Sequence, residues 1–165
     1  CRIDVFSAAL PGETSAELSD RWDADVQRRL SRDGLSDGSV DHRIVLAMGR
    51  ADVESGISLA RSRLNLAKIL DGLERLRLPA FVVGPAPSTD PGTTAAVRDL
   101  SAAFEDVCSR RRIPYVDTVG GLVGHGQWES DLARTPGDHP GQTGYGLIAW
   151  LVLHAGFGRW LGTSS

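Results

Sequence analysis

The chain has 165 residues, of which 41% are hydrophobic and 24% are charged, and its formal net charge is −3 at pH 7. This length and apolar content are typical of one globular domain with a buried core, so we predict a single domain over residues 1–165. The acidic balance, with charges of both signs interspersed, argues against nucleic acid as a partner, while the lack of an apolar run of roughly 18 residues excludes a membrane span. Residues 1–10 do not have the layout of a signal peptide, which favours a cytoplasmic location.

The first elements are predicted close to the start of the chain. Residues 2–8 form a short apolar run and predict a strand. Residues 14–30 predict an amphipathic helix, with Thr14 or Ser15 as its N-cap and Glu17 placed to complete a capping box. The chain therefore begins with a strand followed by a helix.

The alternation continues after a polar loop at residues 32–39. A continuous apolar run predicts a strand at residues 42–49, and a periodic segment predicts a helix at residues 58–76. One face of this helix is expected to be buried, and its residues are Leu59, Leu66, Ile69, Leu70 and Leu73.

The second half of the chain repeats the pattern. It predicts a strand at residues 79–87, a helix at residues 93–111, a strand at residues 113–118 and a last helix that begins near Thr143. The strands are continuously apolar rather than alternating, and a helix joins each strand to the next. This pattern predicts an α/β fold, a three-layer sandwich with a central parallel sheet covered on both faces.

The two cysteines carry little functional information. Cys1 and Cys108 are far apart and fit no metal-binding spacing, so neither a metal site nor a disulfide framework is expected. Cys108 falls on a predicted helix, which favours a buried and inert thiol. Because position 1 is not Met, we expect further residues to precede Cys1.

Chemistry in an open parallel sheet gathers at the carboxyl ends of the strands. Here the motifs are "PGETSAEL" after the first strand, "GRAD" after the second, "VVGPAP" after the third, "IPYVDT" as the fourth and "DHPGQTGYGLIAW" near the end. In this order and spacing, over residues 5–160, the chain resembles the SGNH hydrolases, also called GDSL-type esterases and lipases. The resemblance implies their flavodoxin-like α/β fold and a serine ester hydrolase.

The resemblance assigns roles to particular positions. It implies that His139 is the general base and that the backbone of Gly12 donates to the oxyanion hole. Ala51 occupies the position of the family's oxyanion-hole Asn, and the loss of such a donor costs roughly 10²–10³ in rate in other enzymes. Pro136 occupies the position of the Asp that orients the base, which leaves Asp138 as a candidate to replace it.

The nucleophile has no counterpart, because the family's GDS block is absent from the sequence. Ser7 is rejected, since it lies inside a predicted strand. Either a strand carrying the serine precedes Cys1, or the protein has lost the reaction. The predicted function is hydrolysis of a small acyl ester or thioester, with the nucleophile upstream of Cys1. The alternatives are a degenerate pseudoenzyme that binds without catalysis, and a repurposed acyl-transfer or tailoring enzyme.

Three further residues lie near the predicted site. Arg50 and Asp52 flank Ala51 and are pocket candidates, although surface exposure for Arg50 and a hydrogen bond to loop backbone for Asp52 are the simpler interpretations. His125 lies on a glycine-rich loop and is interpreted as a solvated histidine. A small-molecule acyl ester is the expected partner, no cofactor or metal is expected, and the oligomeric state stays open.

Overall fold

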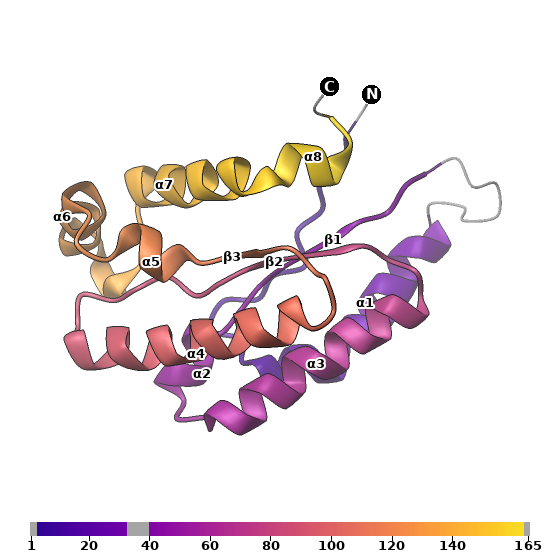
Figure 1. The fold of residues 1–165 in the computed structure, drawn as a ribbon, viewed down its shortest axis with the longest axis horizontal. Coiled ribbons are helices and arrows are strands. Elements are labelled where there is room, and N and C mark those ends of the chain that lie inside the picture. Colours follow the sequence, from indigo (N-terminus) through magenta and orange to yellow (C-terminus); the bar gives the residue numbers. More distant parts are fainter. Residues whose placement is uncertain (1–2, 33–39, 164–165) are drawn as a thin grey trace.

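A computed structural model describes residues 3–32 and 40–163. It contains a parallel sheet of strands β1 (Ile44–Ala47), β2 (Ala80–Val83) and β3 (Tyr115–Val116), in the order β1-β2-β3 (Figure 1). This confirms the predicted α/β class and parallel sheet. Cys1 and nearly all of the polar loop predicted at residues 32–39 lie outside the described residues.

Helices cover both faces of the sheet, as predicted (Figure 1). The helices on one face are α1 (Ser15–Arg32), α3 (Leu59–Arg75) and α4 (Pro91–Ser109). On the other face lie α7 (Gln142–Val152), a π-helical turn η3 (Leu153–Phe157) and α8 (Gly158–Leu161). Short elements occupy the loops: α2 (Arg50–Glu54), α5 (Thr118–Leu122), α6 (Gly126–Arg134) and the 3₁₀ turn η2 (Pro136–Asp138).

The central strand β2 separates two apolar clusters, because its side chains alternate between the two faces. Ala80 and Val82 pack in the cluster with α1, α3 and α4, whereas Phe81 and Val83 pack against α7, η3 and α8. Phe81 contacts two aromatic rings of that second layer, with ring centroids 5.1 Å from Phe157 and 5.3 Å from Trp160. All four residues of β2 are buried, which explains its continuous apolar sequence.

Local signals fix the helix starts. The amide of Thr14 donates to Glu17 Oε2 (2.8 Å) and the amide of Glu17 donates to Thr14 Oγ1 (3.3 Å), so the predicted capping box is present at α1. These contacts with Thr14 lower the pKa of Glu17. At α4, Asp90 accepts a hydrogen bond from the amide of Thr93 (2.6 Å), and Pro91 occupies the first helical position.

The strand predicted at residues 2–8 is not formed. Residues 3–10 are irregular and exposed, with Val5 at 87% and Phe6 at 60% exposure. A strand needs a neighbouring strand for its backbone hydrogen bonds, and within the described residues β1 pairs only with β2. An apolar run by itself therefore did not suffice to make a strand here.

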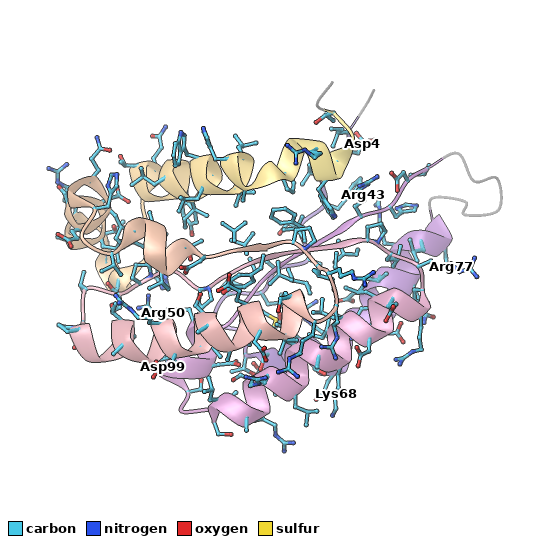
Figure 2. All side chains as sticks on the ribbon, viewed as in Figure 1. Asp4, Arg43, Arg50, Lys68, Arg77 and Asp99 are labelled. Carbon is cyan, nitrogen blue, oxygen red and sulfur yellow. The ribbon has the colours of Figure 1, made fainter. Side chains whose placement is uncertain are left out.

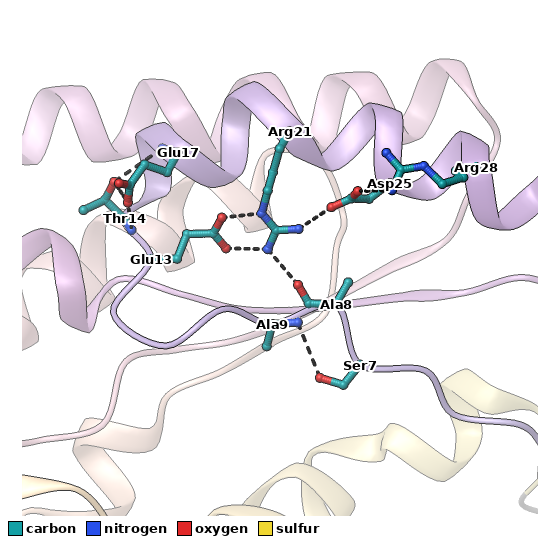
Figure 3. A network of polar contacts seen from close by, with 9 residues as sticks. All are labelled: Ser7, Ala8, Ala9, Glu13, Thr14, Glu17, Arg21, Asp25 and Arg28. Atoms are coloured by element: carbon teal, nitrogen blue, oxygen red, sulfur yellow. Dashed lines mark hydrogen bonds and ion pairs between the residues drawn. The ribbon is translucent and has the colours of Figure 1, made fainter.

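Side-chain contacts hold this N-terminal segment instead (Figure 3). Arg21 of α1 donates to the carbonyl oxygen of Ala8 (2.7 Å) and binds the carboxylate of Glu13. The guanidinium of Arg29 lies 3.3 Å from the ring centroid of Phe6. The segment is thus attached to α1 rather than to the sheet.

Two predictions about buried residues have different outcomes. Leu66, Ile69, Leu70 and Leu73 are buried, but Leu59 is 45% exposed. The buried stretch of α3 begins at Ser62, so Leu59 lies one turn outside it. Cys108 is fully buried, and this burial raises the pKa of its thiol to about 12, as expected for an inert cysteine.

Within the described residues, none of the helices combines the length and apolar character that crossing a membrane would require.

Candidate functional site

The loops predicted to carry the chemistry meet at the carboxyl end of the sheet. The chain turns from β1 into α2 at Gly49, whose φ is +119°. A Cβ there would lie 2.9 Å from Phe104, so only glycine fits this turn. As a result Arg50, Ala51 and Asp52 begin α2 directly beyond the strand, and Figure 2 shows Arg50 at that end of the molecule.

Arg50 joins the loop after β1 to the loop before α7. Its Nη2 forms an ion pair and a hydrogen bond with Asp138 Oδ2, and its Nε lies 2.8 Å from Glu54 Oε1. The side chain is only 25% exposed. The simpler interpretation of Arg50 as a surface-exposed residue is therefore wrong, because its side chain is mostly buried and pairs with Asp138 and Glu54.

Asp138 also binds the loop after β2. The hydroxyl of Ser88 donates to its Oδ2, and the amide of Thr89 donates to its Oδ1 (2.9 Å). Partial burial would raise the pKa of Asp138, but the hydrogen bonds from Ser88 and Thr89 and the guanidinium of Arg50 outweigh it and lower the pKa to about 2. The carboxylate is thus charged at neutral pH and joins three loops.

Asp52 makes the corresponding connection to α1. It is 1% exposed, and its Oδ1 accepts a hydrogen bond from the amide of Ser15 (2.6 Å). Asn65 of α3 donates to the hydroxyl of the same serine (2.9 Å). Asp52 Oδ2 is buried and has no hydrogen-bond partner among the described residues. Asp52 therefore binds a backbone amide, as expected, but that amide belongs to Ser15 at the start of α1 and not to the loop of Asp52 itself.

Gly12 lies three residues before Ser15, in a turn that needs its conformational freedom. Its φ is +70°, and a Cβ at this position would meet nothing within 4 Å. The amide of Glu13 donates to the carbonyl of Leu10 (3.3 Å) and closes the turn. Arg21 binds the Glu13 side chain from α1 (Figure 3). The turn is exposed, and the contact between Glu13 and Arg21 of α1 holds it in place.

His139 lies on a loop, as predicted. Its backbone is extended (φ −102°, ψ 142°), between η2 and the start of α7. The side chain is exposed, and its imidazole has no hydrogen-bond partner among the described residues. The carboxylate of Asp138 binds Arg50, Ser88 and Thr89 rather than the imidazole.

The predicted residues fall into a connected arrangement around Ala51. Arg50, which precedes Ala51, binds Asp138 in the His139 loop. Asp52, which follows Ala51, binds the amide of Ser15 at the start of α1, just beyond Gly12. Ser88 and Thr89 were missed by sequence reasoning, because nothing local marks a loop hydroxyl and a loop amide as partners of a carboxylate about 50 positions away.

Two hollows lie elsewhere on the molecule. One, of about 300 Å³, lies between α4 and α5 and is lined in part by Ser101, Glu105 and Asp117. The other, of about 330 Å³, lies between α6 and α7 and is lined in part by Asp131 and Thr143. Neither includes Gly12, Ala51 or His139 in its lining.

His125 is the N-cap residue of α6. It is half-buried rather than fully solvated, and its Nδ1 has no partner among the described residues.

Solved structures share this fold. A lipase/acylhydrolase from Enterococcus faecalis is 18% identical with a TM-score of 0.68, and the match covers 90% of this chain and 72% of that one. A GDSL-like lipase from Bacteroides thetaiotaomicron VPI-5482 is 20% identical (TM-score 0.67, covering 87% and 71%). A psychrotrophic esterase from Pseudoalteromonas sp. is 17% identical (TM-score 0.67, covering 94% and 76%). At these identities the likeness concerns the fold.

Sequence comparison identifies the family. No curated protein matches the chain. The profile of the GDSL-like lipase/acylhydrolase family, however, matches residues 2–147, which is most of the sequence and includes the three loops described above. The chain therefore belongs to the GDSL-like lipase/acylhydrolase family.

Proposed function

We propose that the protein hydrolyses small acyl esters or thioesters, with His139 as the general base and the backbone amide of Gly12 in the oxyanion hole. The observation that carries the proposal is the pair of contacts around Ala51. Arg50 binds Asp138 next to His139, and Asp52 binds Ser15 just after Gly12. These contacts support a shared site for residues that lie far apart in the sequence.

The chemistry requires a serine near the base, because the imidazole removes the hydroxyl proton as the oxygen attacks the acyl carbon. The described serines near these loops have other partners. Ser88 donates to Asp138, and Ser15 is buried and accepts from Asn65. Ser7 lies on the irregular segment 3–10, where its oxygen accepts from the amide of Ala9 (3.4 Å), and it has no hydrogen bond with His139 among the described residues. We therefore propose that the nucleophile is a serine on an extended segment ahead of Cys1.

The open edge of the sheet supports that part of the proposal. Within the described residues β1 pairs on one side only, and Val45 is 48% exposed although its register partner Phe81 is fully buried. The nearby N-terminal segment exposes Val5 and Phe6. An added parallel strand would supply hydrogen-bond partners to the backbone groups at the edge of β1 and would cover apolar side chains such as Val45. Its carboxyl end would point toward Ala51.

A second candidate is a binding protein of this fold without catalytic activity. It is favoured by three features: the methyl group of Ala51 cannot donate a hydrogen bond, Pro136 cannot orient a base, and the His139 imidazole has no partner among the described residues. In the first candidate the missing side-chain donor predicts a slow enzyme, and Ala51→Asn should raise kcat.

The test combines labelling with kinetics on the natural protein, including any residues ahead of Cys1. A fluorophosphonate probe, which reacts with activated serines, should label one serine outside residues 1–165. His139→Ala should lower both the labelling rate and the hydrolysis of p-nitrophenyl acetate by about 10²–10⁴-fold. His154→Ala is a matched control, because His154 is exposed and stacks on Trp150.

The outcomes separate the candidates. Label on Ser7 or Ser88 would place the nucleophile inside this chain and contradict the proposed source. An absence of both labelling and hydrolysis in a folded protein would favour the binding protein. Equal losses in His139→Ala and His154→Ala would remove His139 from the mechanism.

A further inference from the structure

The loop that carries His139 contains two consecutive residues in the left-handed region. Gly137 has φ +75° and Asp138 has φ +56°. Glycine adopts this conformation freely, whereas a residue with a Cβ does so at a cost that other contacts must offset. The side-chain contacts of Asp138 offset part of this cost.

Those contacts use both carboxylate oxygens. Oδ2 accepts from the Ser88 hydroxyl and from the Arg50 guanidinium, and Oδ1 accepts from the amide of Thr89 (2.9 Å). Arg50 is itself held by Glu54, at 2.8 Å from its Nε. We call Asp138, Arg50, Ser88 and Thr89 the Asp138 clasp. It fixes the start of the His139 loop against the loops that follow β1 and β2.

We propose that Asp138 is a positioning residue, which sets the place of the His139 imidazole by fixing the backbone beside it and not by bonding the ring. The inference rests on the proposed function, in which His139 is the base. The Asp138 carboxylate bonds Arg50, Ser88 and Thr89, and no hydrogen bond joins it to the His139 ring among the described residues. Pro140 further restricts the backbone at His139.

The clasp also explains how the site tolerates Pro136. The family resemblance predicts an aspartate at that position, bonded to the imidazole, and proline supplies no such group. In this chain the neighbouring carboxylate restricts the loop, and the ring direction then follows from the fixed backbone and from substrate contacts. Because misplacing a catalytic group by about 1 Å costs about 100-fold in rate, a backbone restraint has kinetic consequences.

The experiment compares wild-type protein with Asp138→Asn by hydrogen exchange and by ester hydrolysis. The amide side chain weakens the Arg50 contact, so the backbone amides of Thr89, of residues 137–139 and of Gly141 should exchange faster, by about tenfold. In an active protein kcat should fall about 10- to 100-fold with KM nearly unchanged, since the base is misplaced but the binding surface is intact.

A second pair of variants distinguishes positioning from general stability. Arg50→Lys keeps the cation and should retain more of kcat than Arg50→Gln. Asp106→Asn is the matched control, because Asp106 also binds two arginines, Arg63 and Arg110, but on the surface of α4. It should change neither exchange at residues 137–141 nor kcat.

Unchanged exchange at residues 137–141 in Asp138→Asn would overturn the inference, whether or not the protein is active. Faster exchange with unaltered kcat in an active protein would overturn it as well. A wild-type protein without esterase activity contradicts the proposed function alone, and the exchange result then still decides whether Asp138 fixes the His139 loop.

Discussion

Strands β1 and β2 are neighbours in one sheet, yet their environments differ sharply. Val45 and Phe81 are register partners on the same face, but Phe81 is fully buried while Val45 is 48% exposed. Among the described residues, the layer formed by α7, η3 and α8 packs on Phe81 and Val83 of β2 and Val116 of β3, whereas Val45 of β1 stays exposed. Strand pairing alone therefore does not bury a residue, because burial depends on what packs above the sheet.

The largest effect is expected from Phe81→Ala. The substitution removes a fully buried ring that packs on Phe157 and Trp160, and such large-to-small changes cost about 3–5 kcal/mol. Urea unfolding followed by circular dichroism would measure the loss. A loss below about 1 kcal/mol would show that the second helical layer is not packed on β2 in solution.

The contacts that Asp138 makes with the loops after β1 and β2 should depend on pH. The pKa of Asp138 is lowered to about 2, so its stabilising effect is complete above about pH 4 and is lost as pH falls toward 2. The depression corresponds to about 2 kcal/mol. The difference in unfolding free energy between wild type and Asp138→Asn should therefore be largest near neutral pH and shrink below pH 4. A difference that is independent of pH would contradict the ionised clasp.

The exposed N-terminal segment should depend on Arg21 rather than on the sheet. Arg21→Ala removes the donors to Ala8 and leaves the Glu13 carboxylate, which is only 10% exposed, without its cation. We expect a loss of about 1 kcal/mol and faster amide exchange in residues 8–13. Arg61→Ala, on the exposed start of α3, is a control that should leave this exchange unchanged. Protection that persists in Arg21→Ala would mean that the segment pairs with the sheet.

The smallest effect is expected from Val45→Thr. In a protein of residues 1–165 alone, Val45 is half exposed and threonine has a similar shape and strand preference, so the loss there should be below about 0.5 kcal/mol. The same unfolding experiment as for Phe81→Ala gives the comparison. A loss above about 1 kcal/mol would show that the edge of β1 is covered in solution, as an added strand would cover it.

The sequence by itself determined the elements whose signals are local. The helical stripe from Leu66 to Leu73, the Thr14–Glu17 capping box and the continuous apolar run of β2 were all predictable, since each depends on residues a few positions apart. The family resemblance also followed from the sequence, through the order of its loop motifs. The position of His139 on a loop followed from the residues that surround it.

Only the tertiary structure decided the rest, because those features depend on partners far along the chain. Residues 3–10 have an apolar strand-like sequence but pair with no strand among the described residues, and the carbonyl oxygen of Ala8 accepts a hydrogen bond from Arg21 instead. Arg50 and Asp138 are 88 positions apart, and no periodicity marks them as partners. Such contacts form where the carboxyl ends of separate strands converge, which is a property of the folded sheet and not of any one segment.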